Sequence, residues 1–274
     1  MSRTLSQAQV DELAAAHEQA RITAVPIDPV TRAFPDVTLD DAYAIQAAWI
    51  ELQLAGGAIV TGHKVGLTSR AMQMTMKIDE PDFGALFDYM FLDSGTTISA
   101  SDYLDPKIEV EFAFVLGGTL DRADVTSADV YAATDHIVPA LELIDARSYR
   151  VHPADGRTRT VRDTIADNAA DAGIVVGTER IAPSDAAAGA LRWAGAICKR
   201  NGTVEETGLG AGVLDDPVQG VVWLANRLHG LGIPLAAGET ILAGSFTRPI
   251  DCRPGDRIHA DFGPLGVLTL AVGD

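Results

Sequence analysis

The chain has 274 residues, 47% of them hydrophobic, and its 21 Lys and Arg against 38 Asp and Glu give a formal net charge of −17. This composition supports a sizeable core, but the acidity argues against binding to nucleic acid or to an anionic membrane surface, because both attract clustered Lys and Arg. The sequence has no run of 18 apolar residues, no apolar signal core and only two cysteines, so we expect a reduced, soluble, cytoplasmic protein.

The N-terminal part of the chain is predicted to be helical. Residues 6–20 carry an apolar stripe at helical spacing, and Ser6 is the candidate N-cap. A second helix is predicted after Thr38, where two aspartates begin a run of apolar residues at helical spacing, and Gly56-Gly57 ends it. We therefore divide the chain into a small helical part, residues 1–57, and a β-rich domain, residues 58–274.

The β-rich domain contains short apolar runs separated by Gly, Pro and Asp, a pattern typical of strands. The predicted strands lie at residues 58–67, 107–117, 137–146, 172–177, 240–244 and 257–272, and two helices are predicted at residues 185–200 and 217–229. Strands and helices do not alternate regularly, which argues against a doubly wound sheet and favours an α+β fold. One local basic patch interrupts the acidic chain, with five arginines between Arg147 and Arg162.

Two glutamates share one face of a predicted strand. Glu109 and Glu111 lie in the run KIEVEFAFVL and are two residues apart, so their side chains project to the same side, about 7 Å apart along the strand. Glu142 lies in an equally apolar run, VPALELI. Carboxylates in apolar surroundings need a compensating charge, and oxygen ligands without Cys or His favour Mg²⁺, with Mn²⁺ or Ca²⁺ as alternatives. The other interpretation places all three on exposed faces of half-buried strands.

Lys64 and Asp82 are the next candidates for a functional site. Lys64 lies in an apolar run between Gly62 and Gly66, where its ammonium would be partly desolvated near substrate or carboxylates; a surface lysine is the alternative. Asp82 lies between Pro81 and Phe83-Gly84, in a segment typical of a cap or turn, although an acid there is sometimes a positioned proton carrier.

Two familiar motifs fail in this sequence. The glycines at 208, 210 and 212 do not match a dinucleotide-binding loop and are better explained as turn residues. Ser245 follows a glycine, but Thr247 occupies the position of the second glycine of a nucleophile elbow.

Several segments together carry a resemblance to a known family. In chain order they are GHKVGLTSRAMQ (62–73), EPDFGALFDYMF (80–91), KIEVEFAFVL (107–116), PALELIDAR (139–147), DTIADNAADAG (163–173) and AGSFTRP (243–249). They resemble the fumarylacetoacetate hydrolase superfamily, and within it the hydratase and decarboxylase branch from bacterial meta-cleavage pathways of aromatic catabolism. The resemblance spans nearly the whole chain.

The resemblance implies a mixed β-roll or barrel with surrounding helices, in which residues 58–274 form the catalytic domain. It implies Mg²⁺, or Mn²⁺, bound by Glu109, Glu111 and Glu142, and a homo-oligomer. The implied reaction is the addition of water to a 2-hydroxy-2,4-dienoate, of the C5 or the C7 diacid type, to give a 4-hydroxy-2-oxo acid.

Further residues receive roles by their position in the matching motifs. Lys64 is expected to anchor the substrate carboxylate and assist proton transfer, and Asp82 to pair with Lys64 or orient water. Ser245 and Thr247 are candidates for holding the substrate carboxylate, Asn168 is a further candidate, and one arginine between Arg147 and Arg162 is a candidate for the distal carboxylate of a C7 diacid. A turn motif is the alternative for Ser245 and Thr247, and a solvated loop is the alternative for the arginines.

Other functions stay open on the sequence alone. The same scaffold and metal also suit decarboxylation of a 2-oxohex-3-enedioate. Hydrolysis of an acylpyruvate is a further alternative, but it asks for a Glu–His pair, and His63 beside Lys64 is a poor candidate. A structural partner of a pathway decarboxylase is the non-enzymatic alternative, and association with such a decarboxylase is also compatible with an active enzyme.

Overall fold

A computed structural model describes residues 3–274. The helices are α1 (Gln7–Thr23), α2 (Val30–Ala33), α3 (Leu39–Ala55), α4 (Arg70–Met76), α5 (Ser127–Ala133), α6 (Val161–Ala166), α7 (Pro183–Ala187), α8 (Ala190–Trp193) and α9 (Val218–His229). The strands are β1 (Val60–Gly66), β2 (Asp82–Phe87), β3 (Phe91–Leu92), β4 (Thr97–Ser99), β5 (Lys107–Leu116), β6 (Thr134–Ile144), β7 (Asp171–Val176), β8 (Gly195–Arg200), β9 (Thr203–Leu209), β10 (Thr240–Leu242), β11 (Ile250–Asp251), β12 (Arg257–Asp261) and β13 (Val267–Gly273).

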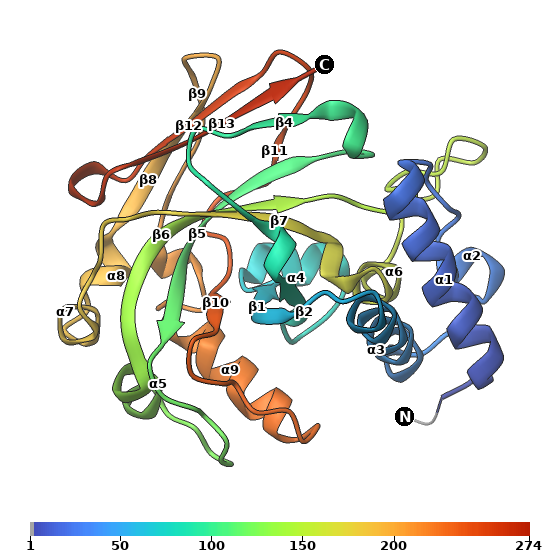
Figure 1. Cartoon of the computed structure of the whole chain (residues 1–274), viewed down its shortest axis with the longest axis horizontal. Helices are drawn as coiled ribbons and strands as arrows, with labels where there is room; N and C mark the ends of the chain where they lie inside the picture. Colours follow the sequence, from blue (N-terminus) through green and yellow to red (C-terminus); the bar gives the residue numbers. More distant parts are fainter. Residues whose placement is uncertain (1–2) are drawn as a thin grey trace.

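The larger sheet is mixed and curls around the centre of the molecule. Its strand order is β2-β1-β10-β5-β6-β7-β3, and β11 adds to β5. The β1–β10 and β3–β7 pairs are parallel, whereas β5, β6 and β7 are antiparallel neighbours. Figure 1 shows β5 and β6 as long curved strands that run from this sheet toward the second one. This curled mixed sheet confirms the predicted α+β fold with a β-roll.

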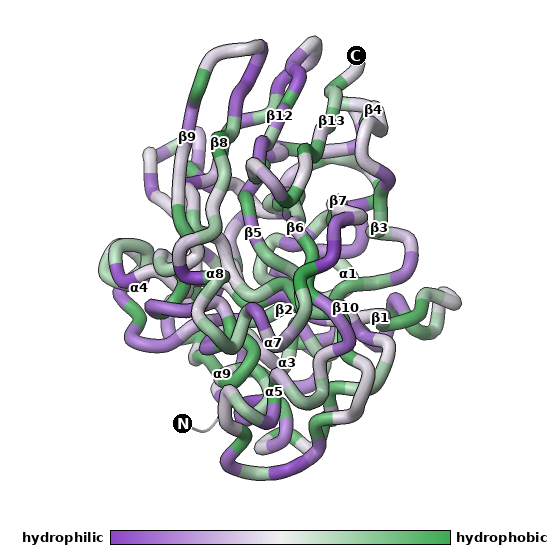
Figure 2. The backbone as a smooth tube through the Cα atoms, turned by 90° about the vertical axis from the view of Figure 1, so that its left-hand side faces the viewer, coloured by the Kyte–Doolittle hydropathy of each residue, from purple (hydrophilic) through white to green (hydrophobic). Residues whose placement is uncertain are grey.

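The second sheet has the order β4-β13-β12-β8-β9 and lies at the upper end of the molecule in Figure 1. Burial alternates along β12 and β13, as expected for strands that cover a core with one face. The hydropathy colours of Figure 2 show the same alternation along β12. The core of the molecule continues between the two sheets, because Ile258, Leu268 and Leu270 belong to the same apolar cluster as Phe112 of β5.

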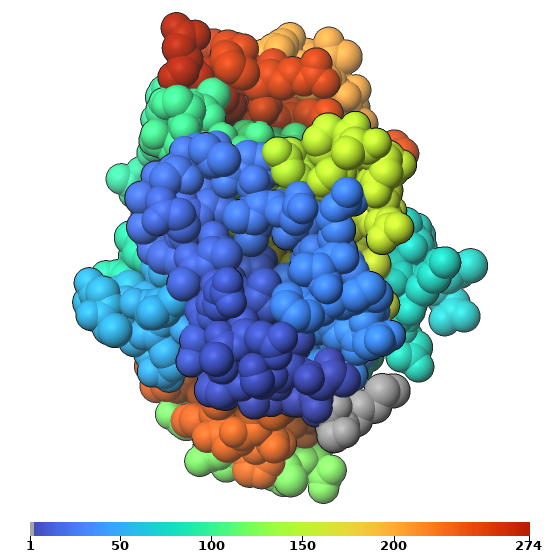
Figure 3. All heavy atoms as spheres, turned by 90° about the vertical axis from the view of Figure 1, so that its right-hand side faces the viewer, coloured from blue at the N-terminus to red at the C-terminus, as the bar shows by residue number. Residues whose placement is uncertain are grey.

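The N-terminal helices cover one side of the larger sheet. Both α1 and α3 begin with capping boxes, at Ser6 and at Thr38, and the cap at Ser6 agrees with the sequence prediction. The two helices pack on each other, and Trp49 of α3 lies in one apolar cluster with Phe87 of β2. Figure 3 shows the N-terminal residues spread over this face. Division of the chain at residue 57 stays a prediction.

Two predicted elements differ from the observed ones. Residues 185–200 were expected to form one helix, but only two short helices, α7 and α8, are present, and β8 follows from Gly195. A run of alanines favours a helix locally, whereas pairing of β8 with both β9 and β12 gives the strand its tertiary support. Residues 257–272 form the two strands of a hairpin, β12 and β13, rather than one long strand.

The helix at residues 217–229 agrees with α9. Within residues 3–274, no helix has both the length and the apolar character needed to cross a membrane.

Asp41 ties the start of the chain to helix α3 and offers a test of stability. Its carboxylate accepts hydrogen bonds from the backbone and hydroxyl of Thr4, the backbone of Leu5, and the backbone and hydroxyl of Thr38. Burial alone would raise the pKa of Asp41, but the hydrogen bonds from Leu5 and Thr38 outweigh it and hold this pKa well below its usual value.

We expect Asp41→Asn to lower the free energy of unfolding by about 2 kcal/mol or more at pH 7, because hydrogen bonds to a charged group are lost. A carboxyl group whose pKa is lower in the folded than in the unfolded protein stabilises the fold only above its unfolded pKa. The loss of unfolding free energy caused by Asp41→Asn should therefore become smaller as the pH falls below about 4. Urea unfolding of the variant and the wild type at pH 7 and pH 3.5 measures this difference in unfolding free energy. Asp36→Asn, at an exposed aspartate, is the control. A loss of unfolding free energy in Asp41→Asn that is the same at both pH values would contradict the expectation.

Candidate metal centre and active site

Three glutamates meet on one face of strands β5 and β6. Glu109 lies directly opposite Glu142 in the antiparallel register, and Glu111 follows two residues further along β5. One carboxylate oxygen from each lies within 4.8 Å of one from each of the others. Because directly opposed like charges destabilise a sheet, this register requires a compensating cation.

The environment of the three carboxylates makes their charges costly. Glu111 and Glu142 are completely buried, and Glu109 is partly buried. Burial and the charge of Glu142 raise the pKa of Glu109 to about 8. Burial, together with Glu142 and Glu109, raises the pKa of Glu111 well above its usual value. Within residues 3–274, Glu111 Oε1 and Glu142 Oε2 receive no hydrogen bond.

These features fit a divalent cation. The cluster has three carboxylates, and the ammonium of Lys64 lies 3.0 Å from Glu142 Oε1, so about two further positive charges are needed for balance. The donor set consists of oxygen atoms alone, which suits Mg²⁺, Mn²⁺ or Ca²⁺. The backbone N–H of Gly244 donates to Glu111 Oε2 at 2.9 Å and helps to hold that side chain in place, leaving Oε1 free for an ion.

Lys64 is a buried lysine on strand β1. It is only 3% exposed, so the surface alternative is wrong. Burial alone would lower the pKa of Lys64, but Glu142 and Asp82 outweigh it and raise this pKa above its usual value. Lys64 is therefore charged, and it forms its ion pair with Glu142.

Asp82 begins strand β2 and lies opposite Gly66 of β1. A side chain at Gly66 would overlap the Asp82 carboxylate and lie 3.3 Å from Lys64 Nζ, so glycine at this position leaves room for both groups. Burial raises the pKa of Asp82 to about 6, although Lys64 acts in the opposite direction. Neither oxygen of Asp82 has a hydrogen-bond partner among the described residues, which differs from the expected cap or turn former.

A cavity of about 420 Å³ opens beside these groups. Glu109, Lys64 and Asp82 line it from the sheet, and Met72 and Met76 of α4 line it as well. The remaining residues that line it are Gly66, Leu67, Thr68, Ser69, Thr75, Ile144, Arg150, Val151, Thr158, Arg159, Thr164, Ala169, Ala170, Ser245, Thr247 and Pro249. The cavity therefore combines the carboxylate cluster, a lysine and an acid with a partly apolar wall, as substrate pockets commonly do.

Ser245 and Thr247 line the cavity from the loop after β10. Ser245 Oγ donates to the carbonyl of Thr247 at 3.0 Å, and Thr247 Oγ1 accepts from the backbone N–H of Val110 at 3.3 Å. The first bond lies within the loop, and the second attaches the loop to β5 beside the glutamates. Ser245 and Thr247 are thus close to the cluster, and their role toward a substrate stays a prediction.

Asn168 lies apart from the cavity wall. Its side-chain Nδ2 donates to the carbonyl of Ala85 at 2.9 Å, and its Oδ1 accepts from the N–H of Ala85 at 2.8 Å. Both polar groups of the amide are therefore hydrogen-bonded to strand β2. It stands first of three consecutive residues with positive φ, and the next two, Ala169 and Ala170, line the cavity instead. This geometry suits a positioning role, and direct substrate contact by Asn168 stays a prediction.

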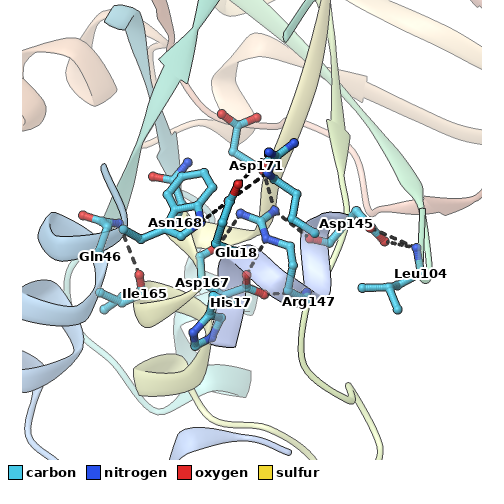
Figure 4. A network of polar contacts seen from close by, with 12 residues as sticks. His17, Glu18, Gln46, Leu104, Asp145, Arg147, Ile165, Asp167, Asn168 and Asp171 are labelled. Atoms are coloured by element: carbon cyan, nitrogen blue, oxygen red, sulfur yellow. Dashed lines mark hydrogen bonds and ion pairs between the residues drawn. The ribbon is translucent and has the colours of Figure 1, made fainter. Parts of the chain in front are cut away.

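The arginines of the basic patch separate into two groups. Figure 4 shows Arg147 at the centre of a polar network: its Nε lies 2.7 Å from Asp167 Oδ1, and its Nη1 donates to the carbonyls of Asp145 and Asp171. The donors of this buried arginine thus bond to other residues of the protein. Arg162 likewise donates to the carbonyl of Val37. Only Arg150 and Arg159 of the patch line the cavity.

Several buried acids were not predicted from the sequence, and Asp171 is one of them that interacts electrostatically with Glu142. Asp171 begins β7, is completely buried, and lines a second cavity of about 190 Å³ together with Arg147. Burial and Glu142 raise its pKa well above the usual value. The available signal was an acid at the start of the apolar run DAGIVV, the same kind of pattern that identified Glu142.

His63 points away from the candidate site. It neighbours Lys64 on β1, so its side chain lies on the opposite face, where its Nε2 is 3.9 Å from Glu239. His63 does not line the cavity formed by the described residues. A water-activating Glu–His pair at the carboxylate cluster therefore receives no support.

Known proteins similar to this chain cover nearly its whole length. The 2-oxo-hept-4-ene-1,7-dioate hydratase of Escherichia coli is 46% identical over 268 residues, which are 98% of this chain and 97% of the relative. The 2-keto-4-pentenoate hydratase of Paraburkholderia xenovorans is 40% identical over 94% of this chain and 93% of the relative.

A solved structure has the same architecture. The 4-oxalocrotonate decarboxylase from Pseudomonas putida G7, complexed with magnesium and adipate, superposes with a TM-score of 0.92 at 32% identity and covers 99% of this chain and 100% of that one. More distant structures, such as a fumarylacetoacetate hydrolase family protein from Yersinia pestis with a TM-score of 0.55 and 16% identity, share the fold alone. No protein-family model matches the sequence. On the evidence of these relatives, the chain belongs to the family of dienoate hydratases and 4-oxalocrotonate decarboxylases, and it has the fold of the fumarylacetoacetate hydrolase superfamily.

Proposed function

We propose that the protein is a metal-dependent hydratase that adds water to a 2-hydroxy-2,4-dienoate and forms a 4-hydroxy-2-oxo acid. The observation that carries the proposal is the buried cluster of Glu109, Glu111 and Glu142 beside Lys64, at a cavity that also holds Asp82. The hydratase relatives support the reaction, and the magnesium complex of the decarboxylase supports the kind of ion.

Glu109, Glu111 and Glu142 are proposed as the ligands of Mg²⁺, with Mn²⁺ as the alternative. A divalent ion supplies Lewis acidity at the 1-carboxylate and 2-oxygen of such a substrate. The three carboxylates provide the negative charge that keeps the ion in place, and the Gly244 N–H fixes the orientation of Glu111.

Lys64 and Asp82 are proposed as the groups that act on the substrate itself. The Lys64 ammonium binds the substrate's 1-carboxylate and assists proton transfer to carbon 5. Asp82 orients the water that adds at carbon 4 and accepts its proton, a task that suits a carboxyl group with a pKa of about 6. Ser245 and Thr247 support the 1-carboxylate from the loop after β10, with Asn168 as a further candidate.

The direct test measures the ultraviolet absorbance of 2-hydroxypenta-2,4-dienoate and 2-hydroxyhepta-2,4-diene-1,7-dioate with the purified chain. We expect Mg²⁺-dependent loss of dienol absorbance, loss of activity with a chelator, and recovery with Mg²⁺ or Mn²⁺. Activity of the chain alone separates an enzyme from a purely structural partner. Release of CO₂ from 2-oxohex-3-enedioate without hydration of either dienoate would overturn the proposal in favour of decarboxylation, which the solved decarboxylase makes the second candidate.

We propose a homo-oligomer that associates with a decarboxylase of the same catabolic route, in the cytoplasm. Two buried free cysteines, Cys198 and Cys252, suit a reducing compartment.

A further inference from the structure

Residues 150–159 form a short two-stranded ribbon at the cavity. Val151 pairs with Thr158 in an antiparallel bridge, and the N–H of Arg159 donates to the carbonyl of Arg150 at 3.0 Å. Arg150 and Arg159 are therefore opposite each other across the ribbon, and both line the cavity. Two like charges directly opposite each other destabilise an antiparallel pair unless an anion lies between or beside them.

The carboxylates nearest to the two arginines are shared with other cations. Arg159 Nη1 lies 3.3 Å from Asp167 Oδ2, but Asp167 also holds Arg147, which approaches its other oxygen at 2.7 Å. Arg150 Nε lies 2.7 Å from Asp105, which is half exposed. Lys107 also lies 3.8 Å from Asp105, although its closer partner is Asp251. Arg150 Nη2 is buried and donates no hydrogen bond to any described residue.

The ribbon thus keeps guanidinium donors that the surrounding protein does not fully use. The side chain of Arg159 is only 8% exposed, and its burial, followed by the charge of Arg150, lowers its pKa to about 10. A guanidinium with free donors at a partly apolar cavity is suited to a carboxylate, which it binds through two parallel hydrogen bonds.

We infer that Arg150 and Arg159 bind a second carboxylate of the substrate and so select a dicarboxylate dienoate over a monocarboxylate one. The inference rests on the proposed function, in which the first carboxylate lies at Lys64 and the glutamate cluster. The cavity then holds one cationic site for each end of a dianion: the ion with Lys64, and the arginine pair. Arg147 is excluded from this role because its donors are used within the fold.

The experiment compares 2-hydroxyhepta-2,4-diene-1,7-dioate with 2-hydroxypenta-2,4-dienoate in the wild type, Arg150→Gln and Arg159→Gln. We expect the ratio of kcat/KM for the diacid to kcat/KM for the monoacid to fall by about 10- to 100-fold in each variant, mainly through KM for the diacid. Arg159→Lys, which keeps the charge but not the two parallel donors, should recover part of the ratio. The matched control is Arg157→Gln, an exposed arginine of the same ribbon that does not line the cavity.

A binding measurement separates failure of this inference from failure of the proposed function. Calorimetry with adipate and hexanoate in the presence of Mg²⁺ compares ligands that differ by one carboxylate, without turnover. Wild-type preference for adipate that disappears in Arg150→Gln and Arg159→Gln supports the arginine site even if neither dienoate is hydrated. Equal losses on the diacid and the monoacid, or an adipate preference that survives in both folded variants, would overturn it.

Discussion

Glu111→Gln is expected to lower the Mg²⁺-dependent turnover of the dienoate on the order of 10³-fold, because a metal ion supplies several kcal/mol of transition-state stabilisation. Glutamine keeps the shape of the side chain and can still accept the hydrogen bond from Gly244. It removes one negative charge from the cluster, and with it the attraction for a divalent ion. Turnover at a series of Mg²⁺ concentrations measures the loss.

The same variant has a second expected result that does not depend on activity. Without metal, Glu111→Gln should melt higher than the wild type by about 2–4 °C at pH 7, because the wild type must either bury this charge beside Glu109 and Glu142 or bind a proton on folding. The rise in Tm on adding Mg²⁺ should be smaller than in the wild type. The exposed Glu51→Gln on α3 should behave like the wild type in both measurements. Retained turnover together with an unchanged Mg²⁺ shift would show that Glu111 is no ligand.

Lys64→Met should lower kcat by about 10²- to 10⁴-fold if Lys64 assists proton transfer, as general acid–base groups typically do. Methionine fills a similar volume in this buried site, so the fold should persist. Because the ammonium that neutralises Glu142 is lost, Tm without metal should fall, while the Tm increase caused by Mg²⁺ should be at least as large as in the wild type.

Circular dichroism, Tm with and without Mg²⁺, and single-turnover kinetics distinguish the two roles of Lys64. Lys199→Met, on β8 of the second sheet, is the control for loss of a lysine. Turnover within a few-fold of the wild type would make Lys64 a structural counter-charge for Glu142 and nothing more.

The sequence predicts the carboxylate cluster well because the relevant pattern is local. Period two on a strand places Glu109 and Glu111 on one face, and apolar neighbours show that the face is buried. The position of Glu142 beside Glu109 and Glu111 depends on the register of β5 against β6, and no local sequence pattern contains that register. The resemblance to the family, rather than the spacing, supplied that third residue's role.

Other features depend on tertiary contacts and were misjudged or only partly foreseen. The alanine-rich first part of residues 185–200 favours a helix by propensity, yet the last part, β8, pairs with strands on both sides. Asp82 has the local sequence of a turn, whereas the neighbouring β1 makes it the start of a strand. The patch between Arg147 and Arg162 was expected to hold one functional arginine, but only the folded ribbon shows that Arg150 and Arg159 form a pair.

The hydrogen bonds of the Asn168 amide affect whether the edge of the larger sheet can pair with another molecule. Strand β2 is the last strand of its sheet, and a bare sheet edge can pair with another chain. By bonding both the N–H and the carbonyl of Ala85, the Asn168 side chain occupies the groups that an incoming strand would use at that residue. The segment that forms part of the cavity wall thereby also covers this edge of the sheet, which is buried along its length.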